Sequence, residues 1–161
     1  MKHTVYMETF LGTIGISEEN QFITELFFEK DAIEDRSEEK TPLLVEAEKQ
    51  ILAYLSGERK SFDLPLAAKG TDYQKTVWKA LCEIPYGETR SYKQVAEMIG
   101  KKQAFRAVGQ ANNKNPILIL IPCHRVVGAN GNLVGYAAGL DIKKKLLELE
   151  QTHSCVSDKN K

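Results

Sequence analysis

The sequence predicts an α/β fold of the α+β type, in which a small domain with an antiparallel sheet and one helix precedes a mainly helical domain. Short β-rich runs fill residues 5–28, whereas helical periodicity dominates the second half. The charge changes as well: residues 1–65 carry 7 Lys and Arg against 14 Asp and Glu, and residues 66–150 carry 13 against 7. We therefore expect an N-terminal domain at 1–65, a second domain at 66–152 and a disordered tail at 153–161.

The N-terminal domain is expected to contain a three-stranded meander and a helix. Its strands are the three β-rich runs at Val5–Phe10, Thr13–Ser17 and Phe22–Phe28. The mostly charged segment 29–40 is expected to be a solvated loop. Thr41 and Pro42 then start a helix, because a hydroxyl can cap a free backbone N–H and proline suits the first helical position. Gly57 ends that helix, and we find no candidate site in this domain.

Two capping boxes mark the first helices of the second domain. In Thr71–Gln74 and in Ser91–Gln94, a hydroxyl and a side-chain amide can satisfy free backbone groups at a helix start. Apolar residues at spacings of three predict a further helix over 103–113, namely Phe105, Val108 and Ala111. The helix that starts at Ser91 and the helix over 103–113 outline a helix-turn-helix. Many helical hairpins bind nothing, and an ordinary solvated surface could carry the positive excess, so these features only favour a nucleic acid as partner.

The most informative stretch is the buried strand expected at Ile117–Ile121 and the corner after it. Pro122 cannot donate to a β-ladder and so ends the strand, which places Cys123, His124 and Arg125 where the chain leaves the core. A neighbouring base or cation lowers a thiol pKa toward neutrality, so this corner could activate a nucleophile. The alternative is a buried structural cysteine beside a surface histidine.

A final helix is expected from Leu140 to about Gln151, after a turn at Asn130–Gly131. Glu150 falls on the same face as the apolar residues of that helix. A carboxylate that points into a core needs a partner. Alternatively, the helix frays before Glu150 reaches the core.

The rest of the composition excludes several classes of protein. The three cysteines are Cys82, Cys123 and Cys155; their odd number and the absence of a CxxC pair argue against a disulfide framework and a structural zinc site. Cys82 lies beside an apolar stripe and is expected in the core. No apolar run approaches the length of a membrane span, and the first residues lack a secretory signal. We expect a cytoplasmic protein that needs no metal or cofactor.

One segment is more specific than these patterns. Pro122-Cys-His-Arg-Val-Val127, preceded by Asn115-Pro116 and followed by Gly135-Tyr136 and Gly139-Leu140, resembles the O6-alkylguanine-DNA alkyltransferase family. The resemblance covers roughly residues 70–150. It implies a winged-helix-like second domain and a cysteine that takes the alkyl group from damaged guanine in duplex DNA, keeps it, and acts once. A thioether does not exchange with thiols as a disulfide does.

The resemblance also implies roles for single residues. Cys123 matches the alkyl acceptor, His124 the base that reaches the thiol through a bound water, and Glu150 the carboxylate that orients the imidazole. The implied DNA-contacting and pocket residues are Tyr92, which binds the flipped base, Arg106, which fills the gap it leaves, the small residues Ala104, Ala107 and Gly109 at the minor groove, Asn115, which braces the cysteine turn, and Tyr136, Val126 and Ala137 around the base.

Some positions depart from the family pattern. Ala137 and Ala138 stand where some members have Ser and Gly, so only the backbone can donate to O6 there. The N-terminal domain also lacks the cysteines with which some members bind zinc. Two other classes stay open: a protein that binds lesions without repairing them, and a cysteine hydrolase. We expect a monomer that acts on double-stranded DNA carrying O6-alkylguanine, with O4-alkylthymine as a second candidate lesion, and that has no membrane partner.

Overall fold

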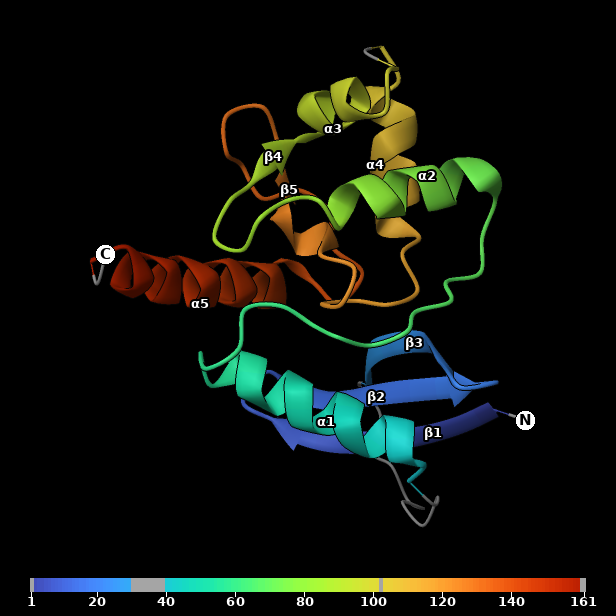
Figure 1. The fold of residues 1–161 in the computed structure, drawn as a ribbon. Coiled ribbons are helices and arrows are strands. Elements are labelled where there is room, and N and C mark those ends of the chain that lie inside the picture. Colours follow the sequence, from blue (N-terminus) through green and yellow to red (C-terminus); the bar gives the residue numbers. More distant parts are fainter. Residues whose placement is uncertain (1, 30–39, 102, 160–161) are drawn as a thin grey trace.

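The computed structural model describes residues 2–29, 40–101 and 103–159, with side chains as far as Ser154. Its two parts are stacked in Figure 1, with a sheet and helix α1 below and the remaining helices above. This arrangement confirms the predicted α+β class. None of the described helices is both long and apolar enough to cross a membrane.

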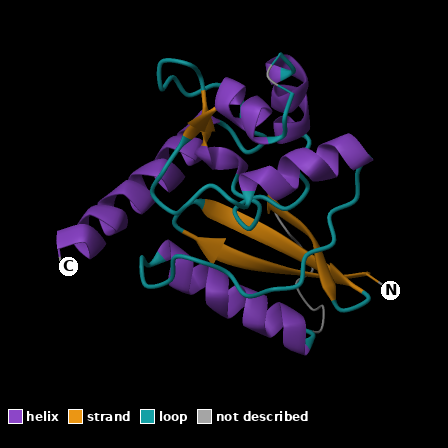
Figure 2. Ribbon diagram, turned by 45° about the horizontal axis from the view of Figure 1, so that its top comes forward, coloured by secondary structure: helices purple, strands orange, loops and turns teal. Residues whose placement is uncertain are grey.

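The lower part is the predicted meander and its helix. Strands β1 (Lys2–Thr9), β2 (Gly12–Glu19) and β3 (Phe22–Glu29) pair antiparallel in that order. Helix α1 (Pro42–Leu55) begins where predicted, with the Thr41 hydroxyl accepting from the Leu44 N–H at 3.1 Å. Figures 1 and 2 show α1 on one side of the sheet and the upper helices on the other, which explains why the middle of β2 is buried throughout. Most of the charged segment predicted as a loop, residues 30–39, lies outside the described residues.

The upper part holds the predicted helix-turn-helix. Its elements are α2 (Asp72–Leu81), β4 (Arg90–Ser91), α3 (Tyr92–Met98), α4 (Phe105–Asn113), the 3-10 turn η1 (Cys123–Arg125), β5 (Val126–Val127) and α5 (Leu140–Lys159). Both predicted capping boxes form. Helix α4 packs on α2 and α3, and the Trp78 indole donates to the Ala111 carbonyl at 2.8 Å. The parallel pair β4–β5 joins the start of α3 to the end of η1.

The strand predicted at Ile117–Ile121 is wrong. Only Ile117 makes a β-bridge, to Leu26 of β3, and the chain then turns, with Ile119 at φ +69°. The Asn115 side chain closes this loop, because its Oδ1 accepts from the Ile117 N–H at 2.9 Å and its Nδ2 donates to the Ile121 carbonyl at 2.9 Å. All five aliphatic side chains are nevertheless buried. Hydrophobicity therefore predicted their burial correctly, but it cannot distinguish a buried strand from a buried loop.

Two other expectations need correction. Helix α5 begins at Leu140 as predicted but continues to Lys159, so residues 153–159 of the expected tail lie in a helix. No Gly or Pro follows Gln151 within this stretch to end it. His153 packs over Gly57, next to the end of α1. Cys82, expected in the core, is exposed at the end of α2.

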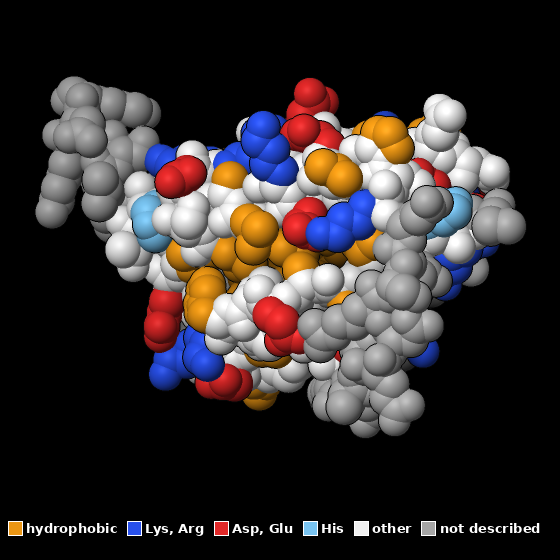
Figure 3. All heavy atoms as spheres, turned by 90° about the horizontal axis from the view of Figure 1, so that it is seen from below, with side chains coloured by type: hydrophobic (Ala, Val, Ile, Leu, Met, Phe, Trp, Pro, Cys, Tyr) orange, Lys and Arg blue, Asp and Glu red, His pale blue; other side chains and the backbone are white. Residues whose placement is uncertain are grey.

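On the lower face of the molecule, the residues that the structure describes form no surface of a single charge. In Figure 3, acidic and basic side chains lie around a band of apolar ones. Helix α1 contributes exposed apolar residues, among them Val45 and Leu52. This visible part of the face therefore lacks the uniformly basic character that favours a polyanion.

Candidate active site

The cysteine corner lies between the two parts and is held rigidly. Cys123 begins η1 and is only 2% exposed. The Asn115 bridge fixes the loop before it, while the Asn112 amide, at the end of α4, donates to the Cys123 carbonyl at 3.4 Å. Asn115 thus bonds to the loop next to the cysteine, where the resemblance implies a bracing role. The supporting role of Asn112 was not predicted. Its position next to Ala111, on the predicted apolar face of this helix, was a signal that its polar side chain is buried and needs a partner.

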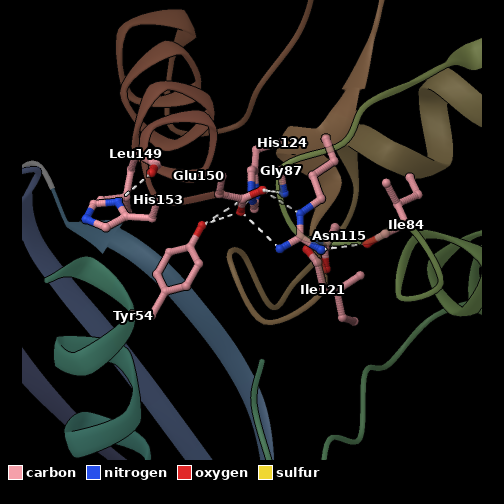
Figure 4. Close-up of polar contacts among 10 residues, drawn as sticks. Tyr54, Ile84, Gly87, Asn115, Ile121, His124, Leu149, Glu150 and His153 are labelled. Atoms are coloured by element: carbon pink, nitrogen blue, oxygen red, sulfur yellow. Dashed lines mark hydrogen bonds and ion pairs between the residues drawn. The ribbon is translucent and has the colours of Figure 1, made fainter. Parts of the chain in front are cut away.

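Glu150 of α5 lies at the centre of a buried polar cluster. Its Oε2 is 2.6 Å from His124 Nε2 and accepts from the Tyr54 hydroxyl at 2.5 Å. The Arg125 guanidinium donates to both carboxylate oxygens, at 2.8 and 3.0 Å, and the Gly87 N–H donates to Oε1 at 3.2 Å. Figure 4 shows Tyr54, Gly87 and His124 converging on this carboxylate from different elements. The predicted alternative of a frayed helix end is therefore wrong.

The charges in this cluster fix which nitrogen of His124 carries a proton. Burial opposes ionisation of Glu150, but its bonds to His124 and Arg125 lower the pKa of the carboxyl to about 2. Burial lowers the pKa of His124, against the opposing influence of Glu150. An ionised carboxylate only accepts hydrogen bonds, so the neutral imidazole must donate from Nε2. Its Nδ1 then has a free lone pair, and this buried atom has no hydrogen-bond partner among the described residues.

The thiol itself differs from the expectation of a lowered pKa. Burial raises the pKa of Cys123 to about 11, although the Asn115 amide and the charge of Lys143 act in the opposite direction. The neighbouring cation, Arg125, is engaged with Glu150. The resting thiol is therefore protonated at neutral pH, and a base must remove its proton before it can attack.

Lys143 is buried, although its place in the sequence predicts a solvated lysine. Its side chain is fully buried, and the ammonium donates to the carbonyls of Val134 and Gly135 at 2.9 and 3.1 Å. Burial lowers its pKa to about 8, while the nearby Cys123 acts to raise it. In the sequence it belongs to a run of three lysines that resembles a solvated surface. A signal was present, because Lys143 is seven residues before Glu150 and shares its face of α5.

Three of the residues that the resemblance assigns to DNA contact, Tyr92, Arg106 and Gly109, line one groove on the surface. A depression of about 290 Å³ is lined by seven residues: Tyr92, Phe105, Arg106, Gly109, Asn113, Val134 and Gly135. The Tyr92 hydroxyl donates to the Val134 carbonyl at 2.8 Å. Gly109 lies against the Tyr92 ring, where a Cβ would be 3.7 Å away. Tyr92 and Arg106 thus share one groove with the loop that Lys143 holds.

The remaining predicted residues divide into two groups. Tyr136 has a buried hydroxyl with no partner among the described residues, and Val126 is fully buried in β5. By contrast, Ala107 and Ala137 are exposed, while Ala104 is half-buried at the start of α4. Small exposed residues beside Arg106 leave this end of α4 open to close approach. Within the described ranges, no three His, Cys, Asp or Glu side chains are placed to hold a metal ion.

Comparison with known proteins identifies the family. Residues 72–152 match the family model described as "6-O-methylguanine DNA methyltransferase, DNA binding domain", and residues 1–68 match its "ribonuclease-like domain". The chain belongs to the 6-O-methylguanine DNA methyltransferase family. The two matched regions span nearly the whole sequence.

Several curated members of this family are close in sequence. The methylated-DNA–protein-cysteine methyltransferase of Methanosarcina barkeri is 66% identical over 67% of this chain and 68% of its own length. The constitutive enzyme of Bacillus subtilis is 45% identical over 94% of this chain and 96% of its own.

Solved structures of the methyltransferase family share the fold. The O6-methylguanine methyltransferase of Mycobacterium tuberculosis superposes with a TM-score of 0.85 at 41% identity, over 95% of this chain and 94% of that one. A structure of M. tuberculosis OGT in complex with DNA gives a TM-score of 0.84 at 41% identity, over 94% of each chain. The family resemblance predicted from the cysteine motif is therefore confirmed.

Proposed function

We propose that this protein repairs duplex DNA by moving an alkyl group from O6-alkylguanine to Cys123, where the group stays. The observation that carries this proposal is the buried thiol beside an imidazole whose free Nδ1 is left available as a base, since Nε2 is committed to Glu150. The names of the family and of its curated members support alkyl transfer to a cysteine of the protein itself.

The reaction follows from these positions. His124 Nδ1 takes the proton of the Cys123 thiol, directly or through a bound water, and Glu150 stabilises the imidazolium that results. The thiolate then attacks the alkyl carbon, an S–C bond forms, and the C–O6 bond breaks. The electron pair of that bond goes to the guanine, which takes up one proton and leaves as unmodified base. The thiol proton balances this proton, so no cofactor is consumed.

Tyr92 is the proposed donor to the leaving guanine. Its hydroxyl lies in the groove and is bonded to the Val134 carbonyl in the free protein. When a base enters, the same hydroxyl can donate to a ring nitrogen and help the guanine leave uncharged. Tyr136, Val126 and the Ala137 backbone are proposed to complete the pocket.

The lesion must leave the duplex to reach the buried thiol, at a cost of a few kcal/mol. Arg106 is exposed on α4 at the edge of the groove, and we assign to it the filling of the gap left by the base. Ala104, Ala107 and Gly109 would then face the minor groove, where small side chains permit close contact.

We also propose that the protein acts as a monomer in the cytoplasm. Every group assigned to the reaction comes from one chain. The acceptor must stay a free thiol, which a reducing compartment favours.

The test is to locate the transferred group. The protein is incubated with a duplex that contains O6-methylguanine, digested, and analysed by peptide mass. We expect one methyl group on the peptide with Cys123, no transfer by Cys123→Ser, and full transfer by the matched variant Cys82→Ser. A methyl group on Cys82, or repeated turnover, would overturn the proposal, and binding without transfer by the wild type would indicate a lesion-binding protein.

A further inference from the structure

Tyr54 brings a hydroxyl from the N-terminal domain into the active site. It lies near the end of α1 and is fully buried. Its hydroxyl donates to Glu150 Oε2 at 2.5 Å and lies 3.5 Å from His124 Nε2, although 96 residues separate it from Glu150 in the sequence. Figure 4 shows the Tyr54 side chain extending from α1 toward both residues. The expectation that this domain contributes no site residue did not include this contact.

The packing around Tyr54 fixes the direction of its hydroxyl. The ring lies 5.3 Å from the ring of Phe62 and 6.1 Å from that of Tyr86, which is nearly perpendicular to it. Burial and the neighbouring Glu150 carboxylate raise the pKa of Tyr54 well above 10. The hydroxyl therefore keeps its proton and acts as a donor. His124 Nε2 also carries a proton, so Glu150 is the acceptor for both groups.

We propose that Tyr54 is a positioning residue for alkyl transfer, because it holds the Glu150 carboxylate in line with His124. This proposal rests on the function proposed above, in which His124 takes the Cys123 proton. The groups that prepare Cys123 for attack then come from both domains. Cys123 and the base His124 lie in the second domain, whereas Tyr54, which donates to Glu150, lies in the N-terminal domain. The N-terminal domain thereby helps to orient the catalytic base, although it supplies no group that reacts.

Tyr54 also weakens the effect of the negative Glu150 carboxylate on the pKa of His124. The charged and titratable groups around the imidazole are Glu150, Arg125, Lys143, the Tyr54 hydroxyl and the adjacent Cys123 thiol. A donor to Glu150 Oε2 disperses the negative charge that stabilises an imidazolium. Without that donor the carboxylate attracts the His124 proton more strongly, so the pKa of His124 rises. The imidazole then becomes protonated, and unable to act as a base, at a higher pH.

The test compares Tyr54→Phe with Tyr86→Phe. Each change removes one buried hydroxyl from the same ring cluster, but the Tyr86 hydroxyl has no hydrogen-bond partner among the described residues. For Tyr54→Phe we expect transfer from free O6-benzylguanine at neutral pH to fall about tenfold, as for a lost bond to a charged group. The acid limb of the rate profile should move to higher pH, and so should the His124 titration in NMR spectra of histidine-labelled protein. Tyr86→Phe should match the wild type in the transfer rate, the acid limb and the His124 titration.

An unchanged acid limb and an unchanged His124 titration in Tyr54→Phe would overturn the proposal, even if the variant were less stable. If Tyr54→Phe does not fold, the wild type still decides: a downfield, slowly exchanging Tyr54 hydroxyl proton is expected, and its absence would contradict the bond to Glu150. Alkylation of Cys123 by iodoacetamide needs no DNA lesion. In Tyr54→Phe, the acid limb of its rate profile should also move to higher pH. If wild-type protein does not react with the free base, the proposed function fails, while the titration and iodoacetamide results still test Tyr54 separately.

Discussion

Replacing Glu150 by Gln tests how much the buried carboxylate contributes to folding. The change keeps the shape of the side chain but removes its charge and adds an amide donor. Arg125, Tyr54, His124 and the Gly87 N–H all point donors at this position. Whichever way the amide turns, its NH2 group meets at least one of these donors, and the Arg125 charge is left without its counter-ion.

The magnitude follows from the depressed pKa of Glu150. A fall from the usual 4.5 to about 2 corresponds to about 3 kcal/mol of stabilisation of the charged form in the folded state. Breaking a buried ion pair by removing one partner typically costs about 3–5 kcal/mol, in agreement with this figure. Because the folded pKa is the lower one, this stability is present above pH 4.5. It is lost as the pH falls toward 2.

Urea unfolding at pH 7 and at pH 3 checks both the size and the sign. Glu150→Gln should be about 3 kcal/mol less stable than the wild type at pH 7, and the difference should shrink at pH 3. Glu148→Gln, at an exposed position on the same helix, is the matched control and should change stability by less than about 0.5 kcal/mol. If the two variants lost equally little, Glu150 would not be the centre of the buried cluster.

Further predictions concern the DNA-facing groove and the loop. Arg106→Ala should slow repair in duplex DNA by about ten- to a hundredfold, since the few kcal/mol of base extrusion lose their compensation, while attack on free O6-benzylguanine stays unchanged; equal losses in the two rate assays would remove this role. Lys143→Met should move the alkylation of Cys123 by iodoacetamide to higher pH, because the positive charge that lowers the thiol pKa is gone; an unshifted profile would show that the charge does not act on the thiol. The same variant should lose about 1–3 kcal/mol in urea unfolding, for two bonds from a charged donor, and a loss no greater than that of the exposed Lys144→Met would contradict the loop contacts. Lys101→Ala should weaken DNA binding and flatten its salt dependence without changing lesion preference, as expected for a phosphate contact; binding titrations on damaged and undamaged duplexes decide this.

Local signals in the sequence predicted the elements that depend on neighbouring residues. Both predicted capping boxes form, at Thr71–Gln74 and at Ser91–Gln94. A capping box could be predicted because it needs only residues within one helical turn. The same holds for Thr41 at the start of α1. Glu150 was placed on the buried face of α5 by periodicity alone, and the structure puts it there.

Long-range contacts account for what the sequence did not predict. Ile117–Ile121 folds as a loop because the Asn115 side chain supplies backbone partners that a strand would need from neighbouring strands. Tyr54 reaches Glu150 only once the two domains are packed together, and no spacing along the chain indicates that contact. Lys143 is followed by two further lysines, so the composition of this run predicts a solvated surface. Only the position of Lys143 on the buried face of α5 indicates that it is buried.

The stoichiometry of transfer with excess DNA containing O6-methylguanine shows whether Cys123 keeps the alkyl group. The thioether formed on Cys123 cannot be cleaved by another thiol of the chain as a disulfide can. We therefore predict a burst of repair equal to the amount of protein present, after which repair stops. Intact protein should gain the mass of one methyl group in place of one hydrogen. Continued repair beyond one equivalent, or a burst without a mass increase on the peptide that contains Cys123, would mean that Cys123 is not the permanent acceptor of the alkyl group.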